Sequence, residues 1–360
     1  MNTSTIRPLV KERLSAINGL RGIAILMVIC HHTLSYTVSK SLHIFRMVHN
    51  GWTGVNLFFI LSGFVLYRPY FLGERHFNTW QDVKWFYKHR FYRLYPLFAL
   101  NVLISVSMNS PISWTFLKSG LLSLTTLTQF TTDNFFPIIN PVLWSLMLEI
   151  WFSVFFPLLI LLINRFGFSS VLVSSLIIAL VFRLVGYRFE FSSSIYVTPF
   201  KDNFFARLDD FVAGMLVVRL YYQHTQIKAW PLTIVSLLAL LASFHLWDMR
   251  ALNQLPDYIM PFLNILIIVG FCGLTLSALQ TKSFLWYIFS FKPLQLTGMM
   301  CYSIYLWHFL IHVKIEGLPG SVNYLIYAVI VFCISALTYR YIEFGSTKDY
   351  RKLFLLDDTK

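Results

Sequence analysis

Long apolar stretches alternate with short polar segments along almost the whole chain. Ten of these stretches have roughly 20 residues, enough for a helix to cross a hydrocarbon core of ~30 Å. We place them at about 17–37, 52–72, 93–110, 142–164, 168–186, 204–222, 230–247, 259–279, 294–314 and 322–343. The pattern predicts an all-α, polytopic membrane protein with about ten transmembrane helices. Residues 112–130 are also apolar but short and rich in Ser and Thr, which favours an interfacial or re-entrant piece over another span.

The distribution of basic residues predicts the orientation of these helices. Ten spans place both termini on the same side of the membrane. Of the 29 Lys and Arg residues, 20 lie in or next to the termini and the loops on that side. Cytoplasmic loops of membrane proteins are enriched in Lys and Arg, so both termini are expected in the cytoplasm. The expected organisation is a cytoplasmic N-terminal segment at 1–16, a membrane domain at 17–343 and a cytoplasmic tail at 344–360.

Composition excludes a soluble globule and several kinds of site. Hydrophobic residues make up 57% of the chain and charged residues 12%, whereas soluble domains carry about 25% charged residues. The net charge of +13 is accounted for by cytoplasmic loops, so no nucleic-acid partner is expected. The four cysteines lie in apolar runs without a CxxC spacing, and no histidine spacing matches a metal site. We therefore expect neither disulfides nor a metal.

Arg21 and His32 share one stripe of the first predicted helix. They are eleven positions apart, which at ~100° per residue brings them within about 20° of the same direction. The helical rise separates them by roughly 16 Å, a spacing that suits an extended ligand. The alternative is that Arg21 reaches the cytoplasmic interface while His32 makes one interhelical hydrogen bond.

A basic and aromatic segment, KWFYKHRFYRLYP at residues 84–96, precedes the third span on the predicted cytoplasmic side. Arg90 and Arg93 lie at i and i+3, so both can face one polyanion, and guanidinium groups suit phosphates. The alternative is a solvated cluster in contact with anionic lipid headgroups.

Further ionisable residues fall at or within apolar runs. Glu149 opens the fourth span and requires a partner, for which a histidine or an arginine would serve. Asp209 and Asp210 lie near Arg207 in the sixth span and are expected to form an internal ion pair. His308 follows an aromatic run in the ninth span, where a buried, hydrogen-bonded histidine explains the pattern as well as a function does.

Five motifs that contain these residues occur in order. They are INGLRGIA at 17–24 with a histidine eleven positions after its arginine, GVNLFFILSGF at 54–64, RFYRLYP at 90–96, LWSLMLE at 143–149 and YSIYLWH at 302–308. Together they resemble the acyltransferase 3 family of integral-membrane O-acyltransferases, and the resemblance extends from about residue 15 to 343.

The resemblance implies a bacterial inner-membrane enzyme of ten helices that uses acyl-CoA, commonly acetyl-CoA, as co-substrate without a resident cofactor. It implies transfer of the acyl group to a sugar hydroxyl of a surface polysaccharide or glycolipid, such as lipopolysaccharide O-antigen or exopolysaccharide. Peptidoglycan and, in some members, macrolides are further acceptors in the family. Many relatives carry an additional C-terminal hydrolase-like domain, and without it the membrane domain or its loops are expected to bind the acceptor.

The same resemblance assigns roles to residues of this chain. His32 matches the family's catalytic histidine, and Arg21 matches the arginine paired with it. Glu149 is expected to stabilise the charged form of His32. Arg90 and Arg93 match a cytoplasmic arginine pair, which is expected to bind acyl-CoA.

Other residues of these motifs are expected to support that site. Lys88 is expected to join the arginine pair in binding acyl-CoA, while Tyr95, Ser145 and His308 are expected to support the site as a whole. Asn18 and Asn56 depart from the family, which more often has Asp at both positions, so neither is assigned a catalytic role.

These roles define a mechanistic hypothesis. An alcohol is a poor nucleophile at neutral pH, so a base beside the thioester is needed, and a neutral His32 would accept the hydroxyl proton. No Ser or Cys is indicated as a nucleophile, which favours a ternary complex over an acyl-enzyme. The competing class is a secondary transporter of an anionic solute, with intramembrane His and Arg as coupling groups.

Overall fold

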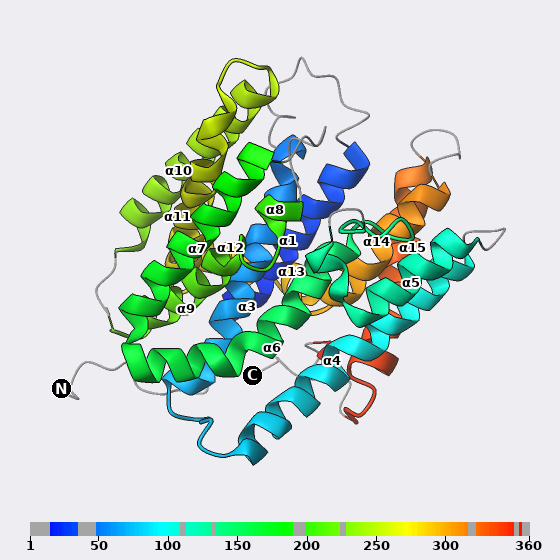
Figure 1. Ribbon diagram of the computed structural model, residues 1–360, viewed down its shortest axis with the longest axis horizontal. Coiled ribbons are helices and arrows are strands. Elements are labelled where there is room, and N and C mark those ends of the chain that lie inside the picture. The colour runs from blue at the N-terminus through cyan, green and yellow to red at the C-terminus, as the bar shows by residue number, and fades with distance from the viewer. Residues whose placement is uncertain are drawn as a thin grey trace. The chain divides into compact units, whose positions relative to one another are not determined.

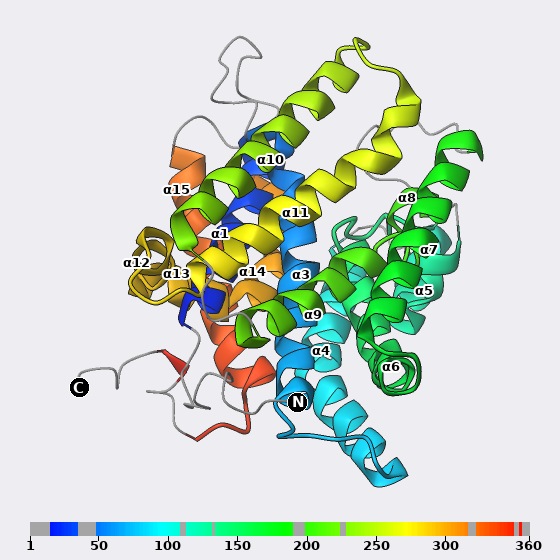
Figure 2. The same cartoon turned by 90° about the vertical axis from the view of Figure 1, so that its left-hand side faces the viewer.

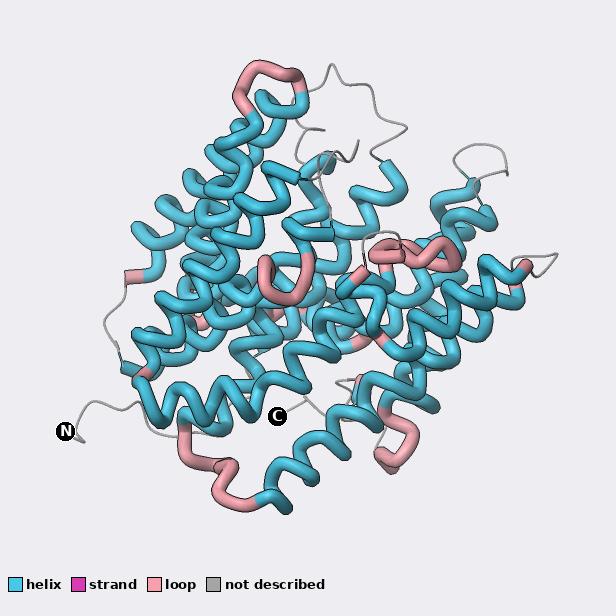
Figure 3. Tube along the Cα trace, in the orientation of Figure 1, coloured by secondary structure: helices cyan, strands magenta, loops and turns pink. Residues whose placement is uncertain are grey.

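The computed structural model describes residues 15–34, 48–108, 113–131, 134–189, 199–223, 228–315, 322–348 and 353–354. In these ranges all regular secondary structure is helical, loops and turns join the helices, and no strand occurs (Figure 3). The longer helices are α1 (Ser15–Leu34), α3 (Gly54–Phe71), α4 (Trp80–Ser107), α5 (Trp114–Thr125), α6 (Leu143–Phe166), α7 (Phe168–Phe189), α9 (Leu208–Gln223), α10 (Ala229–Ala251), α11 (Met260–Ala278), α14 (Cys301–Ile315) and α15 (Val322–Thr338). The short elements are η2 (Asn50–Thr53), η3 (Leu127–Phe130), α8 (Pro199–Asp202), η4 (Asp257–Ile259), α12 (Phe284–Phe289), α13 (Lys292–Met299) and η5 (Tyr339–Glu343).

Each of the ten predicted spans overlaps a helix in the described part of the chain, which confirms a helical polytopic membrane protein. Seven helices in the described part of the chain are long and apolar enough to cross a bilayer. An eighth candidate is the pair α13 and α14, which is bent by 75° at Met300. The remaining two predicted spans correspond to the second half of α4 and to α9, so a total of ten, and the orientation, stay predictions. Helix α5 has 12 residues, about 18 Å at 1.5 Å per residue, too short to span.

The chain forms two compact units that are each built from distant segments. Unit 1 contains Met1–Phe77 and Leu158–Gly298, and unit 2 contains Asn78–Pro157 and Met299–Lys360. Helix α6 passes from unit 2 into unit 1 after Pro157. The expected membrane domain is therefore built from two units whose segments alternate along the chain.

In unit 1, α3 and α9 pack at backbone distance. A side-chain carbon on Gly63 would collide with the carbonyl oxygen of Phe211, and one on Gly214 would collide with that of Ile60. Small residues at such positions let membrane helices approach closely and gain dispersion contacts. Helices α10 and α11 form a second packed pair, visible in both Figure 1 and Figure 2.

Helix α1 is fitted against α12 and α13 in the same way. Gly19 faces the backbone of Phe289, Gly22 faces that of Leu294, and Gly298 faces the carbonyl oxygen of Asn18. The two glycines of the INGLRG motif are thus explained by close packing, which fixes the side-chain directions along α1, including those of Arg21 and His32.

Unit 2 is organised around the long helix α4. Thr79 and Asp82 form a capping box, in which the Asp82 amide donates to Thr79 Oγ1 at 3.3 Å and the Thr79 amide donates to Asp82 Oδ2 at 2.8 Å. Such a box supplies hydrogen-bond partners to amides that a helix start otherwise leaves unpaired. Helix α4 packs against α5, α14 and η5, and α14 packs against α15.

Candidate functional site

The pair Arg21 and His32 lies in unit 1, and both residues are on α1. Arg21 and His32 are both half-buried on α1, with His32 in its last turn. Because α1 is an uninterrupted helix from Ser15 to Leu34, the separation of roughly 16 Å along its axis holds. The two side chains therefore lie on one face of α1, at two depths along the helix axis.

A second histidine links His32 to the start of α3. The rings of His31 and His32 are 5.2 Å apart between centroids, and His31 Nδ1 lies 2.8 Å from the carbonyl oxygen of His49. A carbonyl can only accept, so the Nδ1 of His31 carries the hydrogen in this contact. His49 directly precedes η2, which leads into α3, so three histidines gather at this end of unit 1.

Next to them, the described helices enclose a network of buried charges. Arg183 of α7 donates to both carboxylate oxygens of Asp209, at 2.8 and 2.6 Å, and to the carbonyl oxygen of Ala206. Only 5% of the Arg183 side chain and 1% of the Asp209 side chain are exposed. Two-pronged contacts of this kind are the strong form of an arginine–carboxylate pair.

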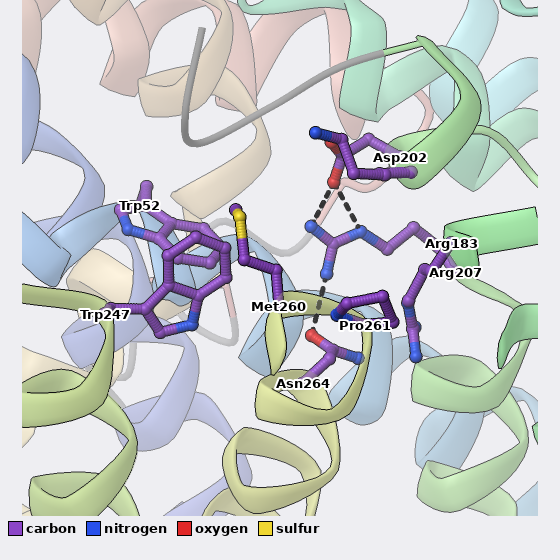
Figure 4. Close-up of a pocket in the computed structure, with 9 residues that line it drawn as sticks. Trp52, Arg183, Asp202, Arg207, Trp247, Met260, Pro261 and Asn264 are labelled. Atoms are coloured by element: carbon purple, nitrogen blue, oxygen red, sulfur yellow. Dashed lines mark hydrogen bonds and ion pairs between the residues drawn. The ribbon is translucent and has the colours of Figure 1, made fainter. Parts of the chain in front are cut away.

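Arg207 is the centre of the network. Its Nε donates to Asp202 Oδ1 at 2.9 Å, and its Nη1 donates to Asp210 Oδ2 at 3.3 Å and to Asn264 Oδ1 at 3.0 Å. Asn56, where the family more often has Asp, donates to both oxygens of Asp210 at 3.1 and 3.0 Å. Figure 4 shows the Arg207 guanidinium between Asp202 and Asn264. The expected pairing of Arg207 with Asp210 is confirmed, whereas Asp209 makes its two-pronged pair with Arg183.

In unit 2, Arg90 and Arg93 both have carboxylate partners. Arg90 donates through Nε to Ser153 Oγ at 2.9 Å and through Nη2 to Glu149 Oε1 at 3.3 Å. Arg93 Nη2 lies 3.4 Å from Glu343 Oε1, and 37% of the Arg93 side chain is exposed. Glu149, for which a histidine or an arginine partner was expected, thus contacts Arg90. Its suggested contact with His32 stays a prediction.

The remaining motif residues of unit 2 are hydrogen-bonded. Ser145 Oγ donates to Tyr305 Oη at 2.6 Å, and the Tyr95 hydroxyl donates to the carbonyl oxygen of Leu124 at 3.0 Å. His308 is fully buried, with Nδ1 2.6 Å from the carbonyl oxygen of Tyr305. Lys88 is exposed on α4. His308 therefore has the environment of a buried structural histidine, while Lys88 is accessible to a ligand.

The structure thus sorts the motifs into two sets. INGLRGIA, His32 and GVNLFFILSGF belong to unit 1, whereas RFYRLYP, LWSLMLE and YSIYLWH belong to unit 2, where their side chains bond to one another. Sequence reasoning missed Arg183, Asp202 and Glu343, which complete the ion pairs, and Asn264, which accepts a hydrogen bond from Arg207. Arg183, inside an apolar run, was the one available signal, because such a residue needs a partner.

Comparison with known proteins identifies the family. Residues 14–340 match a family model described as an acyltransferase domain. Because that match covers nearly the whole chain, the chain belongs to the acyltransferase 3 family. The membership confirms the resemblance that the five motifs indicate and favours an acyltransferase over a transporter.

Several relatives carry names that state an activity. The chain is 24% identical over 366 residues to peptidoglycan O-acetyltransferase OatA of Listeria monocytogenes, covering 92% of this chain and 56% of the relative. It is 25% identical over 380 residues to the putative peptidoglycan O-acetyltransferase YrhL of Bacillus subtilis, covering 91% of this chain and 54% of the relative. It is 24% identical over 376 residues to O-acetyltransferase OatA of Staphylococcus aureus, covering 95% of this chain and 58% of the relative. The chain thus spans little more than half the length of these relatives. No solved structure matches it with significance.

Proposed function

We propose that this protein is a cytoplasmic-membrane O-acetyltransferase that moves an acetyl group from acetyl-CoA to a hydroxyl group of a cell-surface glycan. The observation that carries the proposal is the family match over residues 14–340, joined to the alignment of Arg21 and His32 on one face of α1. Two of the relatives are named for peptidoglycan, which favours peptidoglycan as the acceptor over lipopolysaccharide, exopolysaccharide or a macrolide.

His32 is the proposed general base. It takes the proton of the acceptor hydroxyl while the oxygen attacks the thioester carbonyl carbon. The carbon–sulfur bond then breaks, the acetyl group stays on the acceptor oxygen as an ester, and the proton leaves with the coenzyme A thiolate. The neighbouring His31, held by the carbonyl oxygen of His49, packs edge-on against the His32 ring and limits the directions that this ring can adopt.

Arg90, Arg93 and Lys88 are proposed to bind the phosphate groups of acetyl-CoA. A guanidinium has five N–H donors, and Arg90 directs two of its three nitrogens at Ser153 and Glu149. Glu149 therefore suits a positioning role toward Arg90 besides its suggested role toward His32. Arg93, with 37% of its side chain exposed, and the exposed Lys88 are accessible for the first electrostatic contact.

Arg21 is proposed to line the route of the pantetheine arm, with His32 at the thioester end. The separation of roughly 16 Å along α1 suits a long, thin arm better than a compact nucleotide. We further propose direct transfer within a ternary complex. Trapping of a labelled acetyl–protein after an acid quench would instead demonstrate a covalent intermediate.

The test uses membranes that contain this protein, labelled acetyl-CoA and isolated glycans. We expect label in the glycan, with loss of turnover but retained acetyl-CoA binding in His32→Gln. The matched control is His245→Gln, because His245 is an exposed histidine of α10; it should transfer acetyl groups normally. Normal turnover by His32→Gln would refute the assignment of the base, and solute uptake without transfer would favour the transporter.

A further inference from the structure

A small pocket in unit 1 lies among the buried charges described above. It has a volume of about 30 Å³. Trp52, Trp247 and Met260 form an apolar side, while Asp202, Arg207 and Asn264 contribute to the polar side, where Pro261 is also drawn (Figure 4). The two indole rings pack edge-to-face with centroids 5.1 Å apart. The pocket therefore suits a group that is apolar at one end and polar at the other.

The charge around the pocket favours an uncharged ligand. Three cations line it, Arg183, Lys201 and Arg207. They are balanced by three carboxylates: Asp202 in the lining, Asp209 on Arg183 and Asp210 on Arg207. An additional anion or cation would disturb this balance in surroundings that screen charge poorly.

One hydrogen-bond donor of the lining is unused. Trp247 is 6% exposed, and its Nε1 has no hydrogen-bond partner in the described part of the chain. Buried indole nitrogens usually have one, since an unpaired buried donor costs free energy. The position thus requires an acceptor atom from a ligand.

The size of the pocket limits what enters it. One water needs about 10–15 Å³ of such space, so the pocket accommodates a group of a few heavy atoms. A pyranose ring is too large, whereas a planar substituent on such a ring fits.

The pocket adjoins the end of unit 1 that carries the proposed base. His32 packs on His31, whose partner His49 precedes η2, and η2 contains Trp52. Asn50 of the same short helix donates to Asp248 Oδ1 at 3.2 Å, and Asp248 follows Trp247 directly. A sugar whose hydroxyl lies near His32 can therefore extend a substituent toward this pocket.

We propose that the pocket binds the acetamido group of a 2-acetamido sugar in the acceptor, an assignment that rests on the proposed function. The methyl group packs against the two indoles. The carbonyl oxygen accepts from Trp247 Nε1, and the amide N–H donates to the Asp202 carboxylate. The group is neutral, planar and four heavy atoms in size, and its one acceptor and one donor match these two positions.

The test uses saturation-transfer NMR to measure binding of a probe, the N-acetylglucosamine tetrasaccharide, to the full chain in lipid nanodiscs. The acetamido methyl protons should receive the strongest saturation. The glucosamine tetrasaccharide, which lacks the acetyl group, and the N-propionyl analogue, which has one carbon too many, should bind at least about tenfold more weakly. Equal binding of all three probes, or no binding of any, would overturn the proposal.

Trp247→Phe keeps most of the aromatic surface and removes the Nε1 donor, so the affinity for the N-acetyl probe should fall roughly tenfold. Trp230→Phe, on the exposed part of the same helix α10, is the matched control and should bind normally. An unchanged affinity in Trp247→Phe would refute the assigned contact. Binding as described without acetyl transfer to any glycan would contradict the proposed function alone. Transfer that ignores the acetamido group would contradict the pocket assignment alone.

Discussion

Replacement of Arg207 by methionine tests whether the buried network holds unit 1 together. Arg207 is 6% exposed at its side chain, and its partners Asp202 and Asp210 are 2% and 0% exposed. Removal of one partner from a buried ion pair typically costs about 3–5 kcal/mol, because the remaining charge stays buried without compensation. Methionine has a similar length, so the loss of packing is small by comparison.

The matched control for this prediction is Arg165→Met. Arg165 is exposed near the end of α6, where its guanidinium lies over the ring of Phe166, and substitutions at such surface positions usually change the free energy of unfolding by about 0.5 kcal/mol or less. The two variants remove the same type of charge and differ in burial. They should therefore differ by a few kcal/mol in the free energy of unfolding.

The assay is thermal unfolding of the purified protein in detergent, followed by intrinsic fluorescence. We expect Arg207→Met to lower the midpoint by about 5 °C or more and Arg165→Met to change it little. Adding Asp202→Asn to Arg207→Met should recover part of the loss, since one uncompensated charge is removed. Equal midpoints for the two single variants, or no recovery in the double variant, would refute the interpretation of a tightly coupled buried network.

Three further predictions concern other residues. Arg90→Ala should raise the KM for acetyl-CoA more than it lowers kcat, whereas His32→Gln should lower kcat by about 10²–10⁴; identical kinetic effects would contradict the separate roles. Asn56→Asp should lower the unfolding midpoint, because it brings a second carboxylate within about 3 Å of Asp210. The control Asn18→Asp, at a half-buried position of α1, should change the midpoint less. Gly214→Ala should lower the midpoint, because the added methyl group collides with the backbone of Ile60. The control Ala242→Gly, at an exposed position of α10, should have a smaller effect. An unchanged midpoint in Gly214→Ala would show that α3 and α9 can separate without cost.

Hydropathy predicted the helices well, because about 20 apolar residues in a row have few alternatives to a membrane-spanning helix. It failed to anticipate that residues 294–314 are divided at Met300 into α13 and α14. A bend of this kind depends on the backbone packing of neighbouring helices, such as that between Gly298 and Asn18. Local hydropathy does not depend on this packing and therefore cannot predict the bend.

The partners of the charged side chains were less predictable. Asp209 and Asp210 follow Arg207 closely in the sequence, so an ion pair with Arg207 could be expected from the sequence alone. Arg183 and Asp209, or Arg93 and Glu343, come from separate helices, and their pairing depends on the tertiary fold. Composition showed that each charge needs a partner, and the fold decides which one it receives.

The interleaving of the two units has a consequence for biogenesis. The Tyr302 hydroxyl donates to the carbonyl oxygen of Leu94, across 208 positions of the chain. At ~5–20 residues per second, the ribosome needs roughly 10–40 s to cover that distance. During this time α4 is already in the bilayer but lacks its contacts with α14, which has not yet been synthesised. Early termination of translation would release a membrane protein with an unfinished second half, a natural substrate for quality-control proteases.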